Sequence, residues 1–136
     1  MKLLLPYTSE RRFFIIQYLI GHGLLLLRSN KPDKQSKRID ILFNDVRAME
    51  IRCWFDGITI EETDKSFLAS HASRPLDLME HGNRAYSLKG RGWTGFILGG
   101  IVSYNQDDEV ATAPSALLKN AFGYEPTPYG GIKRDP

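Results

Sequence analysis

Residues 51–62, IRCWFDGITIEE, carry the strongest short-range structural signal in the chain. The dipeptide Asp56-Gly57 stands between two runs that are rich in aromatic and β-branched residues. Asp-Gly favours the two-residue type I′ turn of a β-hairpin, because both central residues of that turn need a positive φ. We therefore predict a hairpin that turns at Asp56-Gly57 and pairs Phe55 with Ile58.

The two faces of this predicted hairpin differ in character. Side chains alternate across the pleat of a strand. One face, the predicted core face, therefore collects six mostly apolar residues: Met49, Ile51, Cys53, Phe55, Ile58 and Ile60. The other face carries Trp54, which falls beside Thr59, and Arg52, which falls opposite Glu61.

The face that carries Trp54 is the predicted partner-binding surface. Tryptophan and arginine are over-represented at the hot spots of protein interfaces. The candidate partner-binding residues are Trp54, Arg52 and Arg47, although Arg47 falls on the core face if the strand is regular. The alternative is a second packing layer, such as a C-terminal helix that covers Trp54.

Residues 38–51, RIDILFNDVRAMEI, predict a second hairpin that turns at Asn44-Asp45. With a two-residue turn, this hairpin adds apolar side chains to the Trp54 face, namely Ile39, Ile41, Phe43, Val46 and Ala48. The strand around residues 46–55 then has apolar neighbours on both faces, as a central strand does. A longer turn would shift the register by one residue and remove this inference.

Most of the remaining chain is typical of short strands joined by turns. Residues 11–29 favour two strands around a central Gly-His-Gly, because aromatic and β-branched residues suit strands and glycines suit turns. Residues 85–106 favour two or three further strands. Residues 29–38 contain no apolar side chain except that of one proline and predict a solvated loop.

The predicted fold class is mainly β: a curved antiparallel sheet, open barrel or sandwich of about seven or eight strands with one or two short helices. Helical segments are expected within residues 64–83 and after Pro114. The chain has 136 residues, of which 42% are hydrophobic and 25% charged, an ordinary globular composition. We predict one domain over residues 1–123, capped at Gly123, and an extended or frayed tail over residues 124–136.

Charge and cysteine content narrow the function classes. The net charge of +2 is small for a nucleic-acid-binding domain. The single cysteine, Cys53, leaves no internal disulfide, which fits a cytoplasmic protein. The N-terminal apolar run stops at Pro6, and the longest apolar stretch is shorter than a bilayer span. Neither a signal peptide nor a membrane segment is therefore predicted.

No catalytic, cofactor-binding or metal-binding residues are predicted. Residues 90–95 match the pattern G-x-G-x-x-G, but strand-like sequence follows them, which favours a glycine-kinked corner of the sheet over a nucleotide loop. His22, His71 and His81 lack the spacing of zinc ligands. A catalytic site that the fold assembles from distant residues stays an open alternative.

The expected function is therefore that of a small intracellular, non-catalytic binding module, with a protein partner or a second copy of the chain as its ligand. The first alternative is a nucleic-acid-binding barrel that uses a basic loop on phosphates and strand aromatics on bases. Its residues are Lys31, Lys34, Lys37, Arg38, Tyr86 and Trp93. Against this alternative, the basic loop is interpreted as solubilising. The second alternative is a small ligand-binding barrel or enzyme.

Overall fold

The computed structural model describes residues 1–122, 124–126 and 132–134. The strands are β1 (Tyr7–Leu19), β2 (Leu24–Ser29), β3 (Arg38–Phe43), β4 (Ala48–Glu50), β5 (Trp54–Thr63), β6 (Arg84–Gly90), β7 (Trp93–Gly99), β8 (Val102–Asp107), β9 (Tyr124–Pro126) and β10 (Ile132–Arg134). The helices are α1 (Lys65–Ala69), α2 (Ala116–Phe122) and the 3-10 segments η1 (Ile20–His22) and η2 (Pro75–Leu78). The predicted cap at Gly123 and much of the predicted tail lie outside the described residues, so the boundary at residue 123 stays a prediction.

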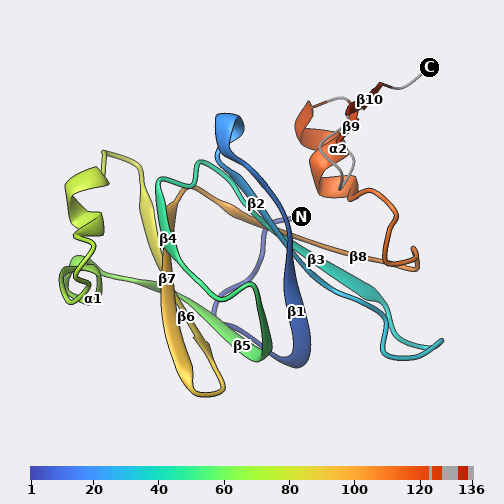
Figure 1. Ribbon diagram of the computed structural model, residues 1–136, viewed down its shortest axis with the longest axis horizontal. Coiled ribbons are helices and arrows are strands. Elements are labelled where there is room, and N and C mark those ends of the chain that lie inside the picture. Colours follow the sequence, from blue (N-terminus) through green and yellow to red (C-terminus); the bar gives the residue numbers. More distant parts are fainter. Residues whose placement is uncertain (123, 127–131, 135–136) are drawn as a thin grey trace.

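β1 to β8 form one antiparallel sheet in the order β4-β7-β6-β5-β1-β2-β3-β8, which confirms the predicted fold class. β9 and β10 pair with each other in a separate ribbon. β7 and β8 follow each other closely in sequence, yet they lie near opposite edges of the sheet. β7 is the neighbour of the edge strand β4, and β8 is the other edge strand. The sheet must therefore curl until its two ends approach, as Figure 1 shows.

The first predicted pair of strands is confirmed. β1 and β2 are antiparallel, with Leu19 opposite Leu24, and η1 joins them. Gly23 ends this connection with a φ of +61°, a left-handed conformation that glycine adopts without strain. The loop predicted over residues 29–38 is residues 30–37, because Ser29 ends β2 and Arg38 begins β3. The strands predicted over residues 85–106 are β6, β7 and β8.

The hairpin predicted at Asp56-Gly57 is wrong. β5 runs through both residues, and its two sides pair with β1 and β6. Gly57 has a φ of +73° and lies where the pairing with β1 shifts, because Ser9 pairs with Ile58 while Arg12 pairs with Asp56. A left-handed glycine serves a β-bulge as well as a turn, so the dipeptide alone does not distinguish the two.

The bulge also explains why part of the predicted core is correct. Phe55 and Ile58 are an odd number of positions apart, yet both are 2% exposed and lie in one core cluster with Ile60. The irregular backbone at Gly57 resets the alternation of side chains between them. Cys53 was expected on the same face but is exposed, since β5 begins at the next residue.

The hairpin predicted at Asn44-Asp45 is also wrong. β3 pairs with β2 and β8, whereas β4 pairs with β7 at the far edge of the sheet. Between them the chain crosses over, and the Val46 amide donates to the Gly23 carbonyl at 2.9 Å. Apolar side chains predicted on the Trp54 face therefore lie in the main core instead: Ile39, Ile41, Phe43 and Val46.

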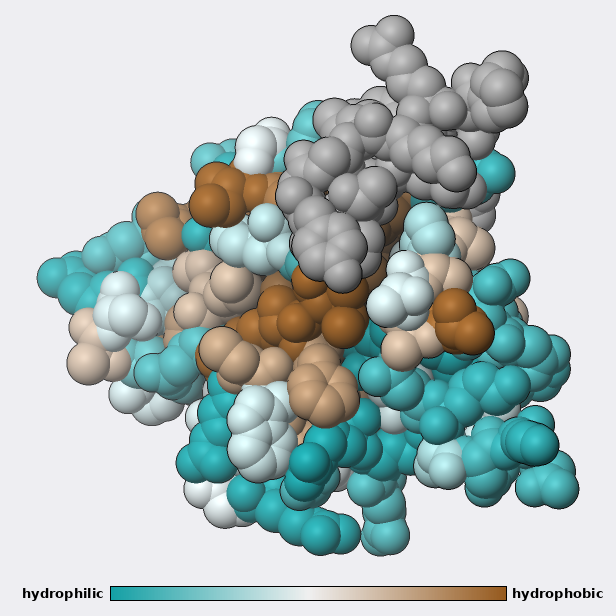
Figure 2. All heavy atoms as spheres, turned by 45° about the vertical axis from the view of Figure 1, so that its right-hand side comes forward, coloured by the Kyte–Doolittle hydropathy of each residue, from teal (hydrophilic) through white to brown (hydrophobic). Residues whose placement is uncertain are grey.

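Apolar side chains form three clusters. The main core fills the inside of the curled sheet, and fully buried members are Phe13, Leu25, Ile41, Ile60 and Ile97. A second cluster on the outer face of β2 and β3 packs against Leu117 and Leu118 of α2. A third lies on β6 and β7 beneath Leu68 of α1. Figure 2 shows apolar residues near the middle of one face, with hydrophilic residues below and to the right.

A buried ion network lies on β2, β3 and β8. Arg28 donates to both carboxylate oxygens of Asp40, at 2.7 and 3.1 Å, and Arg38 donates to both oxygens of Asp107, at 2.9 and 2.8 Å. The two arginines also donate to backbone carbonyls within residues 110–114 and so hold that connection on the sheet. The interpretation of Arg38 as a solubilising loop residue is wrong, because it is 1% exposed.

Residues 90–95 comprise the last residue of β6, the two-residue turn at Arg91-Gly92 and the first residues of β7, so the glycines lie at and around a turn of the sheet. Gly92 has a φ of +76° in this turn. Gly90 gives room to Trp93, since a Cβ there would lie 2.1 Å from the indole Nε1. Gly95 lets β4 approach, since a Cβ there would lie 2.0 Å from the Glu50 carbonyl oxygen.

The expected helical segments are α1 and η2, within residues 64–83, and α2, after Pro114. Asp64 caps α1 by accepting a hydrogen bond from the Phe67 amide. No helix in the described part of the chain is long and apolar enough to cross a membrane.

Candidate functional site

Two of the three predicted site residues, Trp54 and Arg52, line one cleft. The cleft has a volume of about 370 Å³ and lies where the connection before β5, the first residues of β5 and the β6–β7 turn meet. Its lining residues are Arg52, Cys53, Trp54, Phe55, Asp56, Arg91 and Trp93. The fold therefore adds side chains from the β6–β7 turn to those that neighbour Trp54 in sequence.

Trp54 is 54% exposed, and no described element covers it as a second packing layer. It lies opposite Phe14 of β1, not beside Thr59 as the hairpin prediction required. The guanidinium carbon of Arg12 lies 4.7 Å from the centroid of the Trp54 ring. A cation over an exposed indole contributes about 0.5–1 kcal/mol, which helps to fix the ring in one orientation.

Asp56 holds Arg12 in this position. Nε and Nη2 of Arg12 donate to the two oxygens of Asp56 at 2.7 and 2.9 Å. The hydrogen bonds from Arg12 are the main reason why the pKa of the Asp56 carboxyl lies below its ordinary value. Asp56 therefore remains ionised at neutral pH, and the register on either side of Gly57 sets it opposite Arg12.

Trp93 forms the wall of the cleft that faces the core. Its ring packs against that of Phe55, with the centroids 4.9 Å apart, and its indole Nε1 is buried without a hydrogen-bond partner among the described residues. Arg52 lies over the Trp93 ring at 5.9 Å. The predicted pairing of Arg52 with Glu61 is wrong, because Glu61 lies opposite Ser87 of β6.

The cleft carries an excess of positive charge. Arg12 is neutralised by Asp56, but neither Arg52 nor Arg91 forms an ion pair with a described residue. The thiol of Cys53 is exposed in the same cleft. Arg91 interacts electrostatically with Asp56 without an ion-pair contact, and Arg52 lies over Trp93. Two indoles beside two guanidiniums that form no ion pair suit a ligand that has both apolar and anionic parts.

Arg47, the third predicted site residue, lies elsewhere. Its guanidinium pairs with Asp45 at 2.9 Å and with Glu80 at 3.1 Å. Its backbone amide donates to the Leu98 carbonyl at 2.8 Å. Arg47 therefore connects the β3–β4 crossing to the segment before β6, and the structure does not bring it to the Trp54 cleft.

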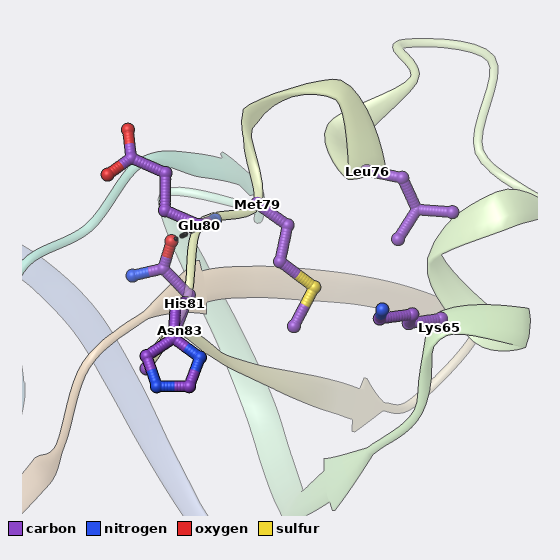
Figure 3. A pocket seen from close by; sticks show the side chains of 7 residues that line it. Lys65, Leu76, Met79, Glu80, His81 and Asn83 are labelled. Carbon is purple, nitrogen blue, oxygen red and sulfur yellow. Dashed lines mark hydrogen bonds between the residues drawn. The ribbon is translucent and has the colours of Figure 1, made fainter.

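Glu80 lines a second pocket of about 530 Å³, beside α1 and η2. Figure 3 shows Met79 extending between Leu76 and Lys65, whereas the Glu80 carboxylate points away from them. The Glu80 amide donates to the Asn83 side chain at 2.8 Å. Nowhere in the described ranges do three His, Cys, Asp or Glu side chains gather closely enough to hold a metal ion.

Several residues of the nucleic-acid alternative are engaged within the fold. Tyr86 is 1% exposed and donates its hydroxyl to a backbone carbonyl at 2.6 Å, so it does not present a face to a base. Arg38 is buried in the ion network. Lys31 and Lys37 lie 3.7 and 2.6 Å from the carboxylate of Asp108.

Arg12, Asp56 and Arg91 are site residues that were not predicted from the sequence. The sequence pattern assigns Asp56 to a turn, and Arg12 reaches it from another strand. Arg91 has a local signal, because it stands between two glycines and two residues before Trp93 at an expected bend.

Comparison of the chain with protein-family models, with curated proteins and with solved structures gives no match. The function is therefore argued from the geometry of the cleft.

Proposed function

We propose that this chain is a non-catalytic protein-interaction module that holds a protein partner, or a second copy of itself, in the cleft around Trp54. The observation that carries this proposal is the exposed indole of Trp54, fixed beneath Arg12 at the start of β5. A large aromatic ring gains free energy when a partner removes it from water. Tryptophan and arginine also dominate the hot spots of protein interfaces.

The chemistry of the cleft supports binding more than catalysis. Asp56 is the carboxylate among its lining residues, and it is ionised and bonded twice to Arg12. A general base must instead be free to accept a proton from the reacting group. The lining contains no histidine that could act as a general base for the thiol of Cys53, as the histidine of a Cys–His pair does.

A cytoplasmic location is part of the proposal. Cys53 is the single cysteine of the chain, and its thiol is exposed. In an oxidising compartment an exposed thiol can form a disulfide with the thiol of another molecule, whereas the cytoplasm keeps thiols reduced. An unpaired thiol in a binding cleft is therefore better suited to the reducing compartment.

We expect Trp54→Ala to abolish capture of the partner while the free energy of unfolding falls by less than about 1 kcal/mol, as for most exposed positions. The indole is more than half exposed, so its removal leaves no internal cavity. The measurements are co-purification of partners with tagged protein from native cells, light scattering for self-association, and urea unfolding.

Leu78→Ala is the matched control, because Leu78 is 52% exposed and does not line the cleft. This variant should capture the partner, or self-associate, as the parent does. Capture that survives Trp54→Ala would overturn the proposal. A loss of capture together with a large loss of stability would do so too, because Trp54 would then belong to the core.

A further inference from the structure

Two arginines of the cleft stand apart from the other arginines within residues 1–122. Six arginines form ion pairs with carboxylates: Arg12, Arg28, Arg38, Arg47, Arg74 and Arg84. Arg11 donates instead to backbone carbonyls of residues 29, 30 and 37. Arg52 and Arg91 form neither kind of contact within the described residues, and both line the Trp54 cleft.

We infer that the cleft receives an acidic peptide segment, with carboxylates on Arg52 and Arg91 and an apolar side chain against Trp54. This inference rests on the proposed function, since it names the chemistry of the partner at the same site. The guanidinium presents a planar fork of donors that matches a carboxylate in two hydrogen bonds. Both arginines are exposed, so they reach a ligand without moving out of the fold.

The surroundings of the cleft favour a peptide over a nucleic acid. A nucleic acid binds by several phosphates in a row and needs a basic track along the surface. Here the positive excess is confined, because Asp56 neutralises Arg12 and β5 continues into the exposed acidic residues Glu61 and Glu62. One or two carboxylates match two guanidiniums, whereas an extended phosphate backbone needs more positive contacts in a row than this cleft offers.

The size of the cleft favours a short segment. Its volume of about 370 Å³ lies near the lower end of the roughly 300–1,000 Å³ that is common for small-molecule pockets. Such a space admits one apolar side chain with the acidic groups beside it. Trp54 offers its exposed ring surface to that side chain, while Trp93 and Phe55 pack on each other at the core side of the same cleft.

Tryptophan fluorescence tests this inference directly, because the two tryptophans of the chain both line the cleft. The probe is the peptide acetyl-Glu-Glu-Leu-Glu-Glu-amide, titrated into the full chain to about 1 mM. We expect a saturable change in fluorescence. The dissociation constant should rise between about 0.1 M and about 1 M salt, since the Debye length falls from about 10 to about 3 Å.

Variants test whether Arg52 and Arg91, and not other surface charges, determine the affinity for the peptide. Arg52→Gln and Arg91→Gln should each weaken the peptide about two- to fivefold, the range of exposed ion pairs, and the double variant about tenfold. Arg74→Gln is the control, because Arg74 is exposed but does not line the cleft, and it should leave the affinity unchanged. The corresponding peptide with glutamine in place of glutamate should bind at least about tenfold more weakly.

Three results would overturn the inference: no saturable change, equal binding of the glutamine peptide, or tighter binding of a single-stranded oligothymidylate than of the acidic peptide. These three results concern only the acidic ligand, so they do not overturn the proposed function. If Trp54→Ala still abolishes capture of the partner, the cleft remains a protein site and its acidic ligand is wrong. If capture survives Trp54→Ala, the proposed function itself fails.

Discussion

Asp40→Ala is expected to lower the free energy of unfolding by about 3–5 kcal/mol, because it leaves the buried guanidinium of Arg28 without a carboxylate partner. Asp40 is 1% exposed and accepts two hydrogen bonds from Arg28. Its second oxygen also lies 3.8 Å from Nη2 of Arg38. Removal of the carboxylate therefore affects two guanidiniums that water cannot solvate.

The same change should loosen the connection between β8 and α2. Arg28 donates to the Ala111 carbonyl at 2.8 Å, and Arg38 donates to the Val110 and Ala113 carbonyls at 2.9 and 2.7 Å. Urea unfolding measures the loss of stability, and amide hydrogen exchange measures the loosening. The control is Asp108→Ala, which removes an exposed partner of Lys37 and should change stability little. Equal stability of the Asp40 variant and the parent would contradict the buried network.

Phe55→Ala is expected to cost about 3–5 kcal/mol, the range for a buried aromatic residue replaced by alanine. Phe55 is 2% exposed, stacks on Phe13 with a centroid distance of 6.3 Å, and packs against Trp93. Its neighbour Trp54 lies on the opposite side of β5. Urea unfolding should therefore show a large loss in the free energy of unfolding for Phe55→Ala and a small loss for Trp54→Ala. Similar losses would show that the two residues share one environment.

Local elements of the fold are predictable from the sequence because their signals are local. The β1–β2 hairpin follows from aromatic and β-branched residues around Gly-His-Gly, and α2 follows Pro114. The two wrong hairpins depend on pairing between distant strands. Gly57 has the left-handed backbone that its sequence suggests, but β1 lies beside β5 and makes it a bulge. Asp45 has a φ of +49° and does turn the chain, yet β4 then pairs with β7.

The burial of charged residues also depends on partners from distant strands, which local sequence does not specify. Arg38 follows a polar loop in the sequence, and nothing near it marks it as buried, because its partner Asp107 lies on a strand much later in the chain. In the candidate site, Trp54 and Arg52 are predicted from the local pattern of residues 51–62. Arg12 and Arg91 reach the cleft through the β1–β5 register and the β6–β7 turn, which local patterns do not specify.

The most direct test of the partner site is a photo-crosslink from position 54. Trp54 is replaced with benzoylphenylalanine in native cells, and Ile20, which is 78% exposed and does not line the cleft, is replaced in a parallel strain as the control. We expect irradiation to join a defined protein, or a second copy of the chain, at position 54 and not at position 20. Equal adducts at both positions, or none at position 54 although the partner is captured, would contradict a partner site at Trp54.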